Sequence, residues 1–281
     1  MTAGQVPDRI VATILGCGSS GGVPRIGNDW GACDPHEPRN RRRRCSLLIE
    51  GWTTGISEPT RVLIDTGADL REQLLDAQVD RVDAVLYTHE HADHTHGIDD
   101  LRVLALHNRR RVDVYFTKEC GARLREAFGY CFETPAGSTY PPILNAHEIT
   151  AGDTISVTGP GGTLEIRSFL QLHGDISSLG FRIGEVAYSC DLSGFPGAAH
   201  EAISGLDIWI IDALRTTPHP SHLSLAETLG LIEQFAPRMA VLTDMHIDLD
   251  YARTDSETPE NVTPAFDGMQ IDIRAGRILN R

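Results

Sequence analysis

Four side chains of metal-binding type lie within six consecutive positions of the chain. His89, His91, Asp93 and His94 form an H-x-H-x-D-H pattern directly after the apolar run Ala84–Tyr87. Such a run predicts a buried strand, and α/β proteins place ligands at the carboxyl ends of their strands. Imidazole and carboxylate groups suit zinc, manganese or iron, and alternate side chains of a loop can converge on two centres. We therefore expect His89 and His91 to bind one divalent ion, and Asp93 and His94 to bind a second.

The elements that must position this motif are strands that alternate with helices. Each half of the chain starts with strands and continues with strand–helix units, without a sequence repeat. The last long helix should begin after Ser224, because Ser224 and Glu227 form an S-x-x-E capping box. Hydrophobic periodicity predicts strands at 10–15, 45–49, 61–65, 83–87, 112–116, 154–158, 163–171, 179–183, 186–190, 207–211, 239–243 and a closing pair within 269–279, and helices at 68–79, 98–108, 119–129, 196–204 and 225–235.

Composition and charge exclude several classes of function. The chain has 281 residues, 41% of them hydrophobic, and this is typical of a folded globular protein. Its 25 basic and 39 acidic residues give a net charge of −14, which argues against a broad electrostatic contact with nucleic acid or anionic lipid. The first ten residues do not resemble a signal peptide, and no run is apolar enough to span a membrane. We expect a cytoplasmic protein with one domain over residues 1–281, and a two-fold homodimer is the commonest assembly of such chains.

A glycine-rich turn follows the first predicted strand. The segment Gly16–Gly21 matches the G-x-G-x-x-G pattern of dinucleotide-binding proteins. That fold needs a helix directly after the turn, whereas Gly22–Pro24 continues here into an irregular segment. We expect a tight turn beside the metal loop, with Ser19 and Ser20 as candidates to contact a substrate phosphate. Turn geometry alone is the alternative interpretation.

An arginine run stands out against the negative net charge. Residues Arg39–Arg44 read RNRRRR, and guanidinium groups bind phosphate through paired hydrogen bonds. A local contact with nucleic acid through Arg41–Arg44 is one interpretation. The other is that these side chains are solvated or paired with carboxylates of an acidic protein.

The histidine motif resembles the signature of the metallo-β-lactamase superfamily. In that family the further ligands are a His, a bridging Asp and a final His, each at a later strand end. The resemblance implies that these ligands are His173, Asp191 and His246. It also implies that Asp65, at the end of the run Val62–Ile64, orients a metal-bound imidazole. A simple turn residue is the alternative for Asp65.

The chain is most similar to the branch that contains the phosphoribosyl cyclic phosphodiesterase and, more distantly, the ribonuclease Z group. Gly21–Pro24, Arg43–Ser46 and Phe266–Met269 carry this resemblance, so it covers nearly the whole chain. In this branch a histidine that does not bind metal assists the leaving group. The resemblance implies that role for His222, which precedes the capped helix.

The cysteines differ from the pattern of that branch. The phosphodiesterase holds a structural zinc through a C-x-C-x-x-C segment and a late histidine. Here Cys33 is the one cysteine of the segment, and Leu249 occupies the position of the late histidine. We predict no structural zinc, and we expect the six scattered cysteines to be free thiols.

The resemblance implies an α/β fold in the form of a four-layer αββα sandwich. It also implies two divalent ions, Zn²⁺ or Mn²⁺, bridged by Asp191 and by a hydroxide that attacks phosphorus, with His222 and Asp93 as catalytic residues. We expect hydrolysis of a small or cyclic phosphodiester of a ribosyl sugar or nucleotide. The alternatives are a thioester or lactone hydrolase, a ribonuclease Z-like nuclease, and a metal-binding or RNA-binding module without catalysis.

Overall fold

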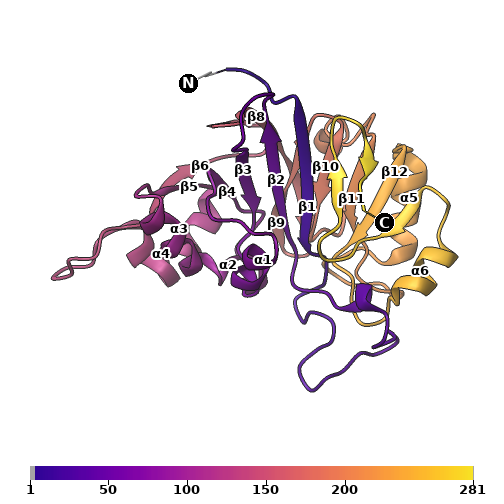
Figure 1. Cartoon of the computed structure of the whole chain (residues 1–281). Coiled ribbons are helices and arrows are strands. Elements are labelled where there is room, and N and C mark those ends of the chain that lie inside the picture. The colour runs from indigo at the N-terminus through magenta and orange to yellow at the C-terminus, as the bar shows by residue number, and fades with distance from the viewer. Residues whose placement is uncertain (1–3, 281) are drawn as a thin grey trace.

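The strands bury apolar side chains on both of their faces. A strand places alternate side chains on opposite sides of its sheet. In β2 (Ser46–Trp52), Leu47 and Ile49 belong to a core between two sheets, whereas Leu48 belongs to a second core beneath helices. The computed structural model describes residues 4–280, and over this range two sheets pack face to face with helices on their outer sides (Figure 1). The predicted αββα sandwich is confirmed.

The first sheet begins with antiparallel strands and continues with parallel ones. Its order is β15-β14-β1-β2-β3-β4-β5-β6, and the pairs from β3 to β6 are parallel. Because β14 pairs with β1, the last part of the chain returns to the first strand. The strands are β1 Arg9–Gly16, β3 Thr60–Ile64, β4 Ala84–Leu86, β5 Val112–Phe116, β6 Leu144–Glu148, β14 Gln270–Asp272 and β15 Arg277–Ile278.

The second sheet repeats this arrangement. Its order is β13-β12-β11-β10-β9-β8-β7, antiparallel from β7 to β10 and parallel from β10 to β13. Parallel neighbours bring their carboxyl ends to one edge of the sheet. The strands are β7 Thr154–Gly159, β8 Gly162–His173, β9 Ile176–Ile183, β10 Val186–Ser189, β11 Ile208–Asp212, β12 Met239–Thr243 and β13 Val262–Pro264.

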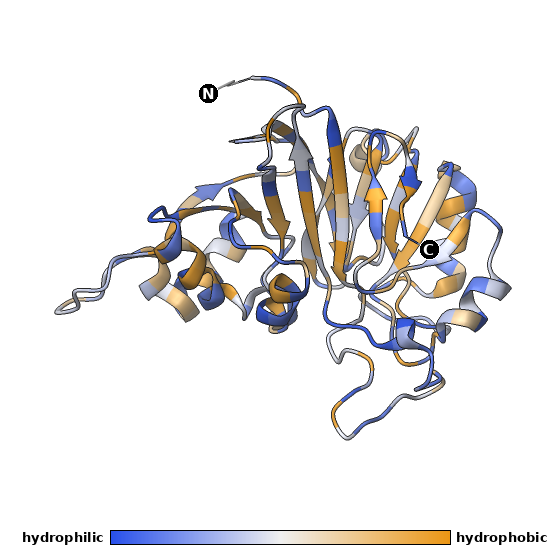
Figure 2. Cartoon of the chain, viewed as in Figure 1, coloured by the Kyte–Doolittle hydropathy of each residue, from blue (hydrophilic) through white to orange (hydrophobic). Residues whose placement is uncertain are grey.

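Helices cover the outer sides of the two sheets, where Figure 2 shows apolar segments of helix against apolar strands. The predicted capping box is present at the start of α5, where Ser224 and Glu227 bond each other's backbone N–H. Within residues 4–280, no helix is long and apolar enough to cross a membrane. The helices are α1 Leu70–Asp76, α2 Ala92–Thr95, α3 Leu101–His107, α4 Lys118–Phe132, α5 Leu225–Phe235 and α6 Tyr251–Glu257, with 3-10 turns at Pro38–Asn40, Ile98–Asp100 and Gly197–Ala199.

The helix predicted at 196–204 is wrong. The segment forms one 3-10 turn, Gly197–Ala199, followed by further turns. Ala199, Ala202 and Ile203 are buried at a helical spacing, and this spacing produced the prediction. The segment begins with Pro196 and Gly197 and ends with Ser204 and Gly205, and proline and glycine have low helix propensity. The elements β6, β13 and α6 were not predicted.

Candidate metal centre and active site

The H-x-H-x-D-H motif lies at the carboxyl end of β4, as predicted. The chain leaves the strand through Tyr87 and Thr88, and His89 then lies buried between the sheets. His91 precedes the one-turn helix α2, which contains Asp93 and His94.

The first group of donor atoms joins both sheets. His89 and His91 come from the loop after β4, His173 ends β8, and Asp191 follows β10. One ligand atom from each of these four residues lies within 4.8 Å of the others. The arrangement brings together His89 and His91, as predicted from their spacing, with the two distant residues that the resemblance implied.

A second group shares Asp191 with the first. The Oδ1 atom of Asp191 lies 3.1 Å from His94 Nε2, and its Oδ2 atom lies 3.7 Å from His89 Nε2. Asp93 Oδ2 lies 3.6 Å from the same nitrogen of His94. The Asp191 carboxylate therefore lies between the two groups, which is the position that a bridging ligand needs.

The imidazoles are oriented by hydrogen bonds to their other nitrogen. Thr88 bonds His89 Nδ1, Asp65 bonds His94 Nδ1, and the carbonyl of Ser221 accepts from His173 Nδ1 at 2.7 Å. Each Nε2 atom is left facing the centre, and that of His89 is buried without a hydrogen-bond partner in the described part of the chain. Metal-binding histidines characteristically show this pattern. The donor set therefore fits divalent ions at this place.

Asp65 is fully buried, and its carboxylate is hydrogen-bonded to two residues of the motif loop. Its carboxylate accepts from the N–H and hydroxyl of Thr88, both at 2.8 Å, and bonds His94 Nδ1 at 2.8 Å. Burial lowers the pKa of His94, but the Asp191 and Asp65 carboxylates outweigh it and raise that pKa well above the usual value. Conversely, burial raises the pKa of Asp191, but His94 and the other histidines hold it well below its usual range.

Three aspartates that follow strands have a left-handed backbone. The φ angles are 63° at Asp65, 53° at Asp191 and 59° at Asp244. Among residues with a side chain, Asp and Asn tolerate this conformation best. Each of these residues is buried at the strand-end edge that holds the donor groups.

His246 lies apart from the compact donor groups. It follows β12 and lines the pocket that opens onto the donor groups. Its Nδ1 atom lies 3.0 Å from Asp248 Oδ1. Its Nε2 atom contacts the guanidinium of Arg25. A cationic group thus occupies the coordinating side of this imidazole, and the role of His246 as a ligand stays a prediction.

His222 faces the centre with two buried carboxylates behind it. Its Nδ1 atom lies 2.9 Å from Asp212 Oδ2 and 3.0 Å from Asp244 Oδ2, and its Nε2 atom lies 3.9 Å from Asp191 Oδ2. Burial lowers the pKa of His222, but the two carboxylates outweigh it and raise the pKa to about 12. Burial, opposed by the contact with His222, raises the pKa of Asp212 to about 6. The two carboxylates therefore favour the cationic form of His222, and its role as a proton donor stays a prediction.

The sequence did not predict the partners of His222. Asp212 ends β11 and Asp244 follows β12, and β10, β11 and β12 are successive parallel strands of the second sheet. Parallel strands bring their carboxyl ends to one edge, so the aspartates at 191, 212 and 244 meet there. The signal in the sequence that could have indicated these partners is an aspartate at the end of each of the two apolar runs.

A pocket of about 280 Å³ opens onto the two donor groups. Ser19 and Ser20 line it, and their contact with a substrate phosphate stays a prediction. Arg25, Arg215 and His219 also line it, and no motif or spacing in the sequence pointed to these three residues. The glycine turn that carries the serines is not followed by a helix, because Gly18 pairs instead with Arg44 and Met245 in isolated bridges.

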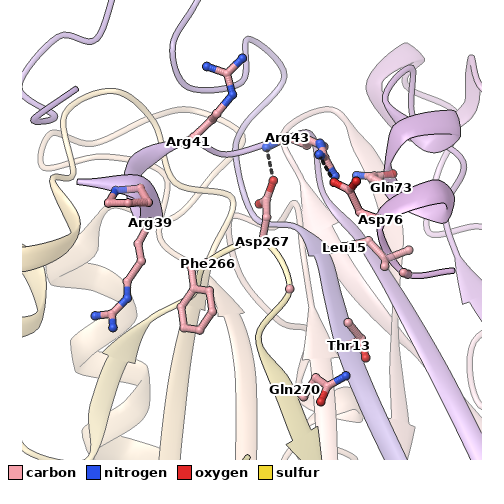
Figure 3. Close-up of a pocket in the computed structure, with 13 residues that line it drawn as sticks. Thr13, Leu15, Arg39, Arg41, Arg43, Gln73, Asp76, Phe266, Asp267 and Gln270 are labelled. Carbon is pink, nitrogen blue, oxygen red and sulfur yellow. Dashed lines mark hydrogen bonds and ion pairs between the residues drawn. The ribbon is translucent and has the colours of Figure 1, made fainter. Parts of the chain in front are cut away.

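The arginine run borders a different cavity, of about 420 Å³, on the outer face of the first sheet (Figure 3). Arg43 turns toward Asp76, to which it is ion-paired. Arg39 lies beside Phe266, and its guanidinium points away from that of Arg41. These side chains do not converge on one point, and the contact with nucleic acid stays a prediction.

The remaining arginines of the run are used within the protein. Arg42 is buried, with Nη1 3.4 Å from the carbonyl of His246 and 3.9 Å from Cys33 Sγ. Arg44 pairs with Asp69 at 3.0 Å. A guanidinium already lies beside the Cys33 thiol, which supports the prediction of no structural zinc. As expected, the cysteines are free thiols, and all six are buried.

Comparison with known families shows the family to which this chain belongs. The model of the beta-lactamase superfamily domain matches residues 60–247, which contain the motif and every candidate ligand. The chain belongs to the metallo-β-lactamase superfamily.

The relatives of this metallo-β-lactamase protein carry names of different activities. The curated octanoyltransferase of Porphyromonas gingivalis (strain ATCC BAA-308 / W83) is 31% identical over 272 residues, 94% of this chain and 52% of that protein. The chain thus spans about half the length of the curated relative that it matches. The name belongs to the longer protein and does not identify the activity of the shared part.

Solved structures cover almost the whole chain. A diphosphatase from the PhnP family is 32% identical with a TM-score of 0.83, over 94% of this chain and 97% of that one. The zinc-bound PqqB from Methylobacterium extorquens is 17% identical, with a TM-score of 0.70 over 93% and 99%. Human tRNase Z, short form, is 18% identical, with a TM-score of 0.62 over 94% and 99%. The last two show the shared fold alone.

Proposed function

We propose that this metallo-β-lactamase protein is a dinuclear phosphodiesterase that hydrolyses a small phosphodiester. The observation that carries the proposal is His222, a proton donor held by two carboxylates opposite the shared carboxylate of Asp191. Hydrolysis of a diester needs both an activated water and a donor for the departing oxygen. The two donor groups would activate the water and His222 would supply the proton, and all of these residues face one pocket.

The candidate ligands divide into two groups. His89, His91 and His173 with Asp191 would hold one ion. Asp93 and His94 would hold the second with the same carboxylate, and His246 would complete that group once its Nε2 atom is free of Arg25. Divalent ions, Zn²⁺ or Mn²⁺, would supply Lewis acidity and an acidified water at neutral pH.

The protein itself contributes orientation and a proton. Asp65 fixes the ring of His94, and the Ser221 carbonyl fixes the ring of His173, so that neither imidazole rotates away from the centre. His222 donates its Nε2 proton to the oxygen that leaves phosphorus. Asp212 and Asp244 hold the Nδ1 side of the same ring and stabilise its cationic form.

The size of the pocket favours a small substrate. A volume of about 280 Å³ suits a sugar phosphate or a nucleotide better than a folded RNA. The PhnP-family diphosphatase supports phosphorus chemistry in particular. Each phosphorus atom of a disubstituted diphosphate carries two ester-type oxygens, so it presents the same reacting centre as a phosphodiester. A cyclic ribosyl or nucleotide diester is the substrate class that we propose.

A thioester or lactone hydrolase is the second candidate from the same superfamily. A thiolate is a good leaving group and needs no proton donor, so the carboxylate-held His222 would have no evident purpose there. A ribonuclease Z-like activity would require a surface that binds RNA, and the arginine run does not present its side chains in one direction.

Hydrolysis of bis(p-nitrophenyl) phosphate tests the proposal. We expect the protein loaded with Zn²⁺ or Mn²⁺ to release p-nitrophenol, and we expect no hydrolysis of a chromogenic β-lactam. His91→Ala, which removes a candidate ligand, should abolish the activity, whereas His36→Ala, a change of an exposed histidine that does not line the pocket, should not. Faster hydrolysis of an acyl thioester than of every diester tested would overturn the proposal.

A further inference from the structure

The second donor group has fewer ligands in place than the first. The first group contains three histidines and the carboxylate of Asp191. The second consists of Asp93 and His94 with the same carboxylate. The imidazole of His246, its expected further ligand, has its Nε2 atom in contact with the guanidinium of Arg25. A donor atom of another kind lies beside this second group.

The thiol of Cys190 lies against the shared carboxylate. Cys190 follows β10, directly precedes Asp191 and is fully buried. Its Sγ atom lies 2.9 Å from Asp191 Oδ1, the same oxygen that lies 3.1 Å from His94 Nε2. One ligand atom from each of these three residues lies within 4.8 Å of the others. Among residues 4–280, Cys190 is the one cysteine that forms such a group with two of the candidate ligands.

The spacing of these atoms is close to that of tetrahedral ligands. Zinc binds nitrogen and oxygen at about 2.0 Å and thiolate sulfur at about 2.3 Å, so its tetrahedral ligands lie about 3.3 to 3.5 Å apart. The Nε2 atom of His94 lies 3.1 Å from Asp191 Oδ1 and 3.6 Å from Asp93 Oδ2. The distance of 2.9 Å from Cys190 Sγ to Asp191 Oδ1 is shorter, because the thiol donates a hydrogen bond to the carboxylate. Separating these two atoms by about 0.6 Å gives the tetrahedral spacing.

A neighbouring cysteine is the alternative partner of Cys190. The Sγ atom of Cys45 lies 3.8 Å from Asp244 Oδ1, and these two residues also form a possible metal-binding group with Cys190. An ion there would compete with His222 for the carboxylate of Asp244, whose Oδ2 atom lies 3.0 Å from His222 Nδ1. The group that contains His94 leaves this pair intact, and it is therefore the group that we favour.

We propose that Cys190 is a ligand of the second metal ion, together with Asp93, His94 and the shared carboxylate of Asp191. This inference rests on the second ion of the function proposed above. On binding, the S–H bond breaks, the sulfur keeps the electron pair and bonds the ion, and the proton passes to solvent. The positive charge of the ion offsets the cost of a buried thiolate.

A thiolate ligand restricts which metal the second site prefers. Soft sulfur ligands favour zinc, whereas manganese prefers carboxylate, carbonyl and water oxygens. Of the two ions expected from the donor set, Zn²⁺ is therefore the one that should occupy the second site. We expect the unaltered protein to retain Zn²⁺ there in the presence of excess Mn²⁺, and Cys190→Ser to exchange it.

Cobalt absorption tests the assignment without turnover. A bond between Co²⁺ and a thiolate gives a near-ultraviolet charge-transfer band, which nitrogen and oxygen ligands do not give. Titration of the metal-free, reduced protein with Co²⁺ should produce this band for one of the two ions. Cys190→Ser should lose the band and weaken the second ion by more than about 100-fold, whereas loss of an outer hydrogen bond to a ligand typically costs about 10-fold to 100-fold.

Cys45→Ser is the matched control, because it removes an equally buried thiol from the neighbouring group. It should keep the band and the affinity for both ions. A band that persists in Cys190→Ser would show that the thiol only donates a hydrogen bond to Asp191, and would overturn the assignment. Loss of the band in Cys45→Ser would place the ion beside Asp244, and would overturn it as well.

X-ray absorption at the zinc edge needs no variant, so it decides the question even if Cys190→Ser does not fold. The unaltered protein with two zinc ions should show sulfur at about 2.3 Å, with an average of about half a sulfur per ion. Zinc surrounded by nitrogen and oxygen alone would overturn the assignment. If the protein hydrolyses diesters without a zinc–sulfur bond, the ligand assignment alone fails. If the bond is present and no diester reacts, the proposed function fails and the assignment stands.

Discussion

Replacing His222 by alanine should slow the reaction by an amount that depends on the leaving group. The ring is held at 2.9 Å and 3.0 Å by Asp212 and Asp244, which keep it protonated, and its Nε2 atom faces Asp191. A positioned acid typically accelerates a reaction by about 10² to 10⁴-fold when the leaving oxygen is basic. An alkoxide needs that proton, whereas p-nitrophenolate, with a pKa of roughly 7, leaves without it.

The assay compares two esters of one nucleotide. We expect His222→Ala to lose about 10² to 10⁴-fold in kcat on thymidine 5′-(methyl phosphate), which corresponds to about 3 to 5 kcal/mol of barrier. On thymidine 5′-(p-nitrophenyl phosphate) the loss should be less than about tenfold. Elemental analysis should find the metal content unchanged, because His222 is not among the proposed ligands.

His219→Ala provides a neighbouring control. The ring of His219 lies 5.2 Å from that of His222, but it has no carboxylate that would keep it protonated among the contacts of the described chain. Any loss in this variant should be equal on the two esters. Equal losses on both esters in His222→Ala, with metal retained, would refute the role as proton donor and indicate that the ring positions the substrate. Loss of metal would make His222 a ligand.

Three further results follow from the site and its surroundings. Elemental analysis should approach two ions per chain, Asp191→Asn should lose affinity at both sites, and a third ion that disappears in Cys33→Ala would contradict the prediction of no structural zinc. In Asp212→Asn the pKa of His222 should fall from about 12, because one of its two carboxylates is gone, so activity on the methyl ester should decline at a lower alkaline pH than in the parent. Burial raises the pKa of Asp267 to about 7, so the folded state should bind a proton that the unfolded state releases near pH 4, and the unfolding free energy should fall by about 4 kcal/mol between pH 4 and 7. Chemical denaturation of Asp267→Asn should show a shallower decline over this range, and an unchanged slope would contradict the reasoning.

Periodicity predicted most of the fold because most elements bury one or both faces. The strand β4 and the capped helix α5 appear where the apolar pattern placed them. The missed elements are short or polar: β6 has the sequence LNAHE at a sheet edge, and β13 contains Pro264. Such edge strands are stabilised by pairing with a neighbour, which a local pattern does not reveal. The single domain over 1–281 stays a prediction, supported by the return of β14 to β1.

The candidate ligands were accessible from the sequence because they lie at strand ends in a recognisable order. The supporting residues were not, since Asp212 and Asp244 reach His222 only when β10, β11 and β12 lie side by side in the second sheet. Arg25 presented no signal at all. Its place in the pocket, in contact with the imidazole of His246, becomes visible only in three dimensions.

The left-handed backbone at Asp65, Asp191 and Asp244 limits which residues evolution can place there. Asparagine and glycine adopt this conformation at little cost, whereas alanine or glutamate would add about 1 kcal/mol of strain. A homologue that has lost the activity would therefore tend to keep Asp, Asn or Gly at these positions, while its histidines are replaced by other residues. An asparagine at the position of Asp191 in a homologue would then mark a fold that has survived the loss of its catalytic centre.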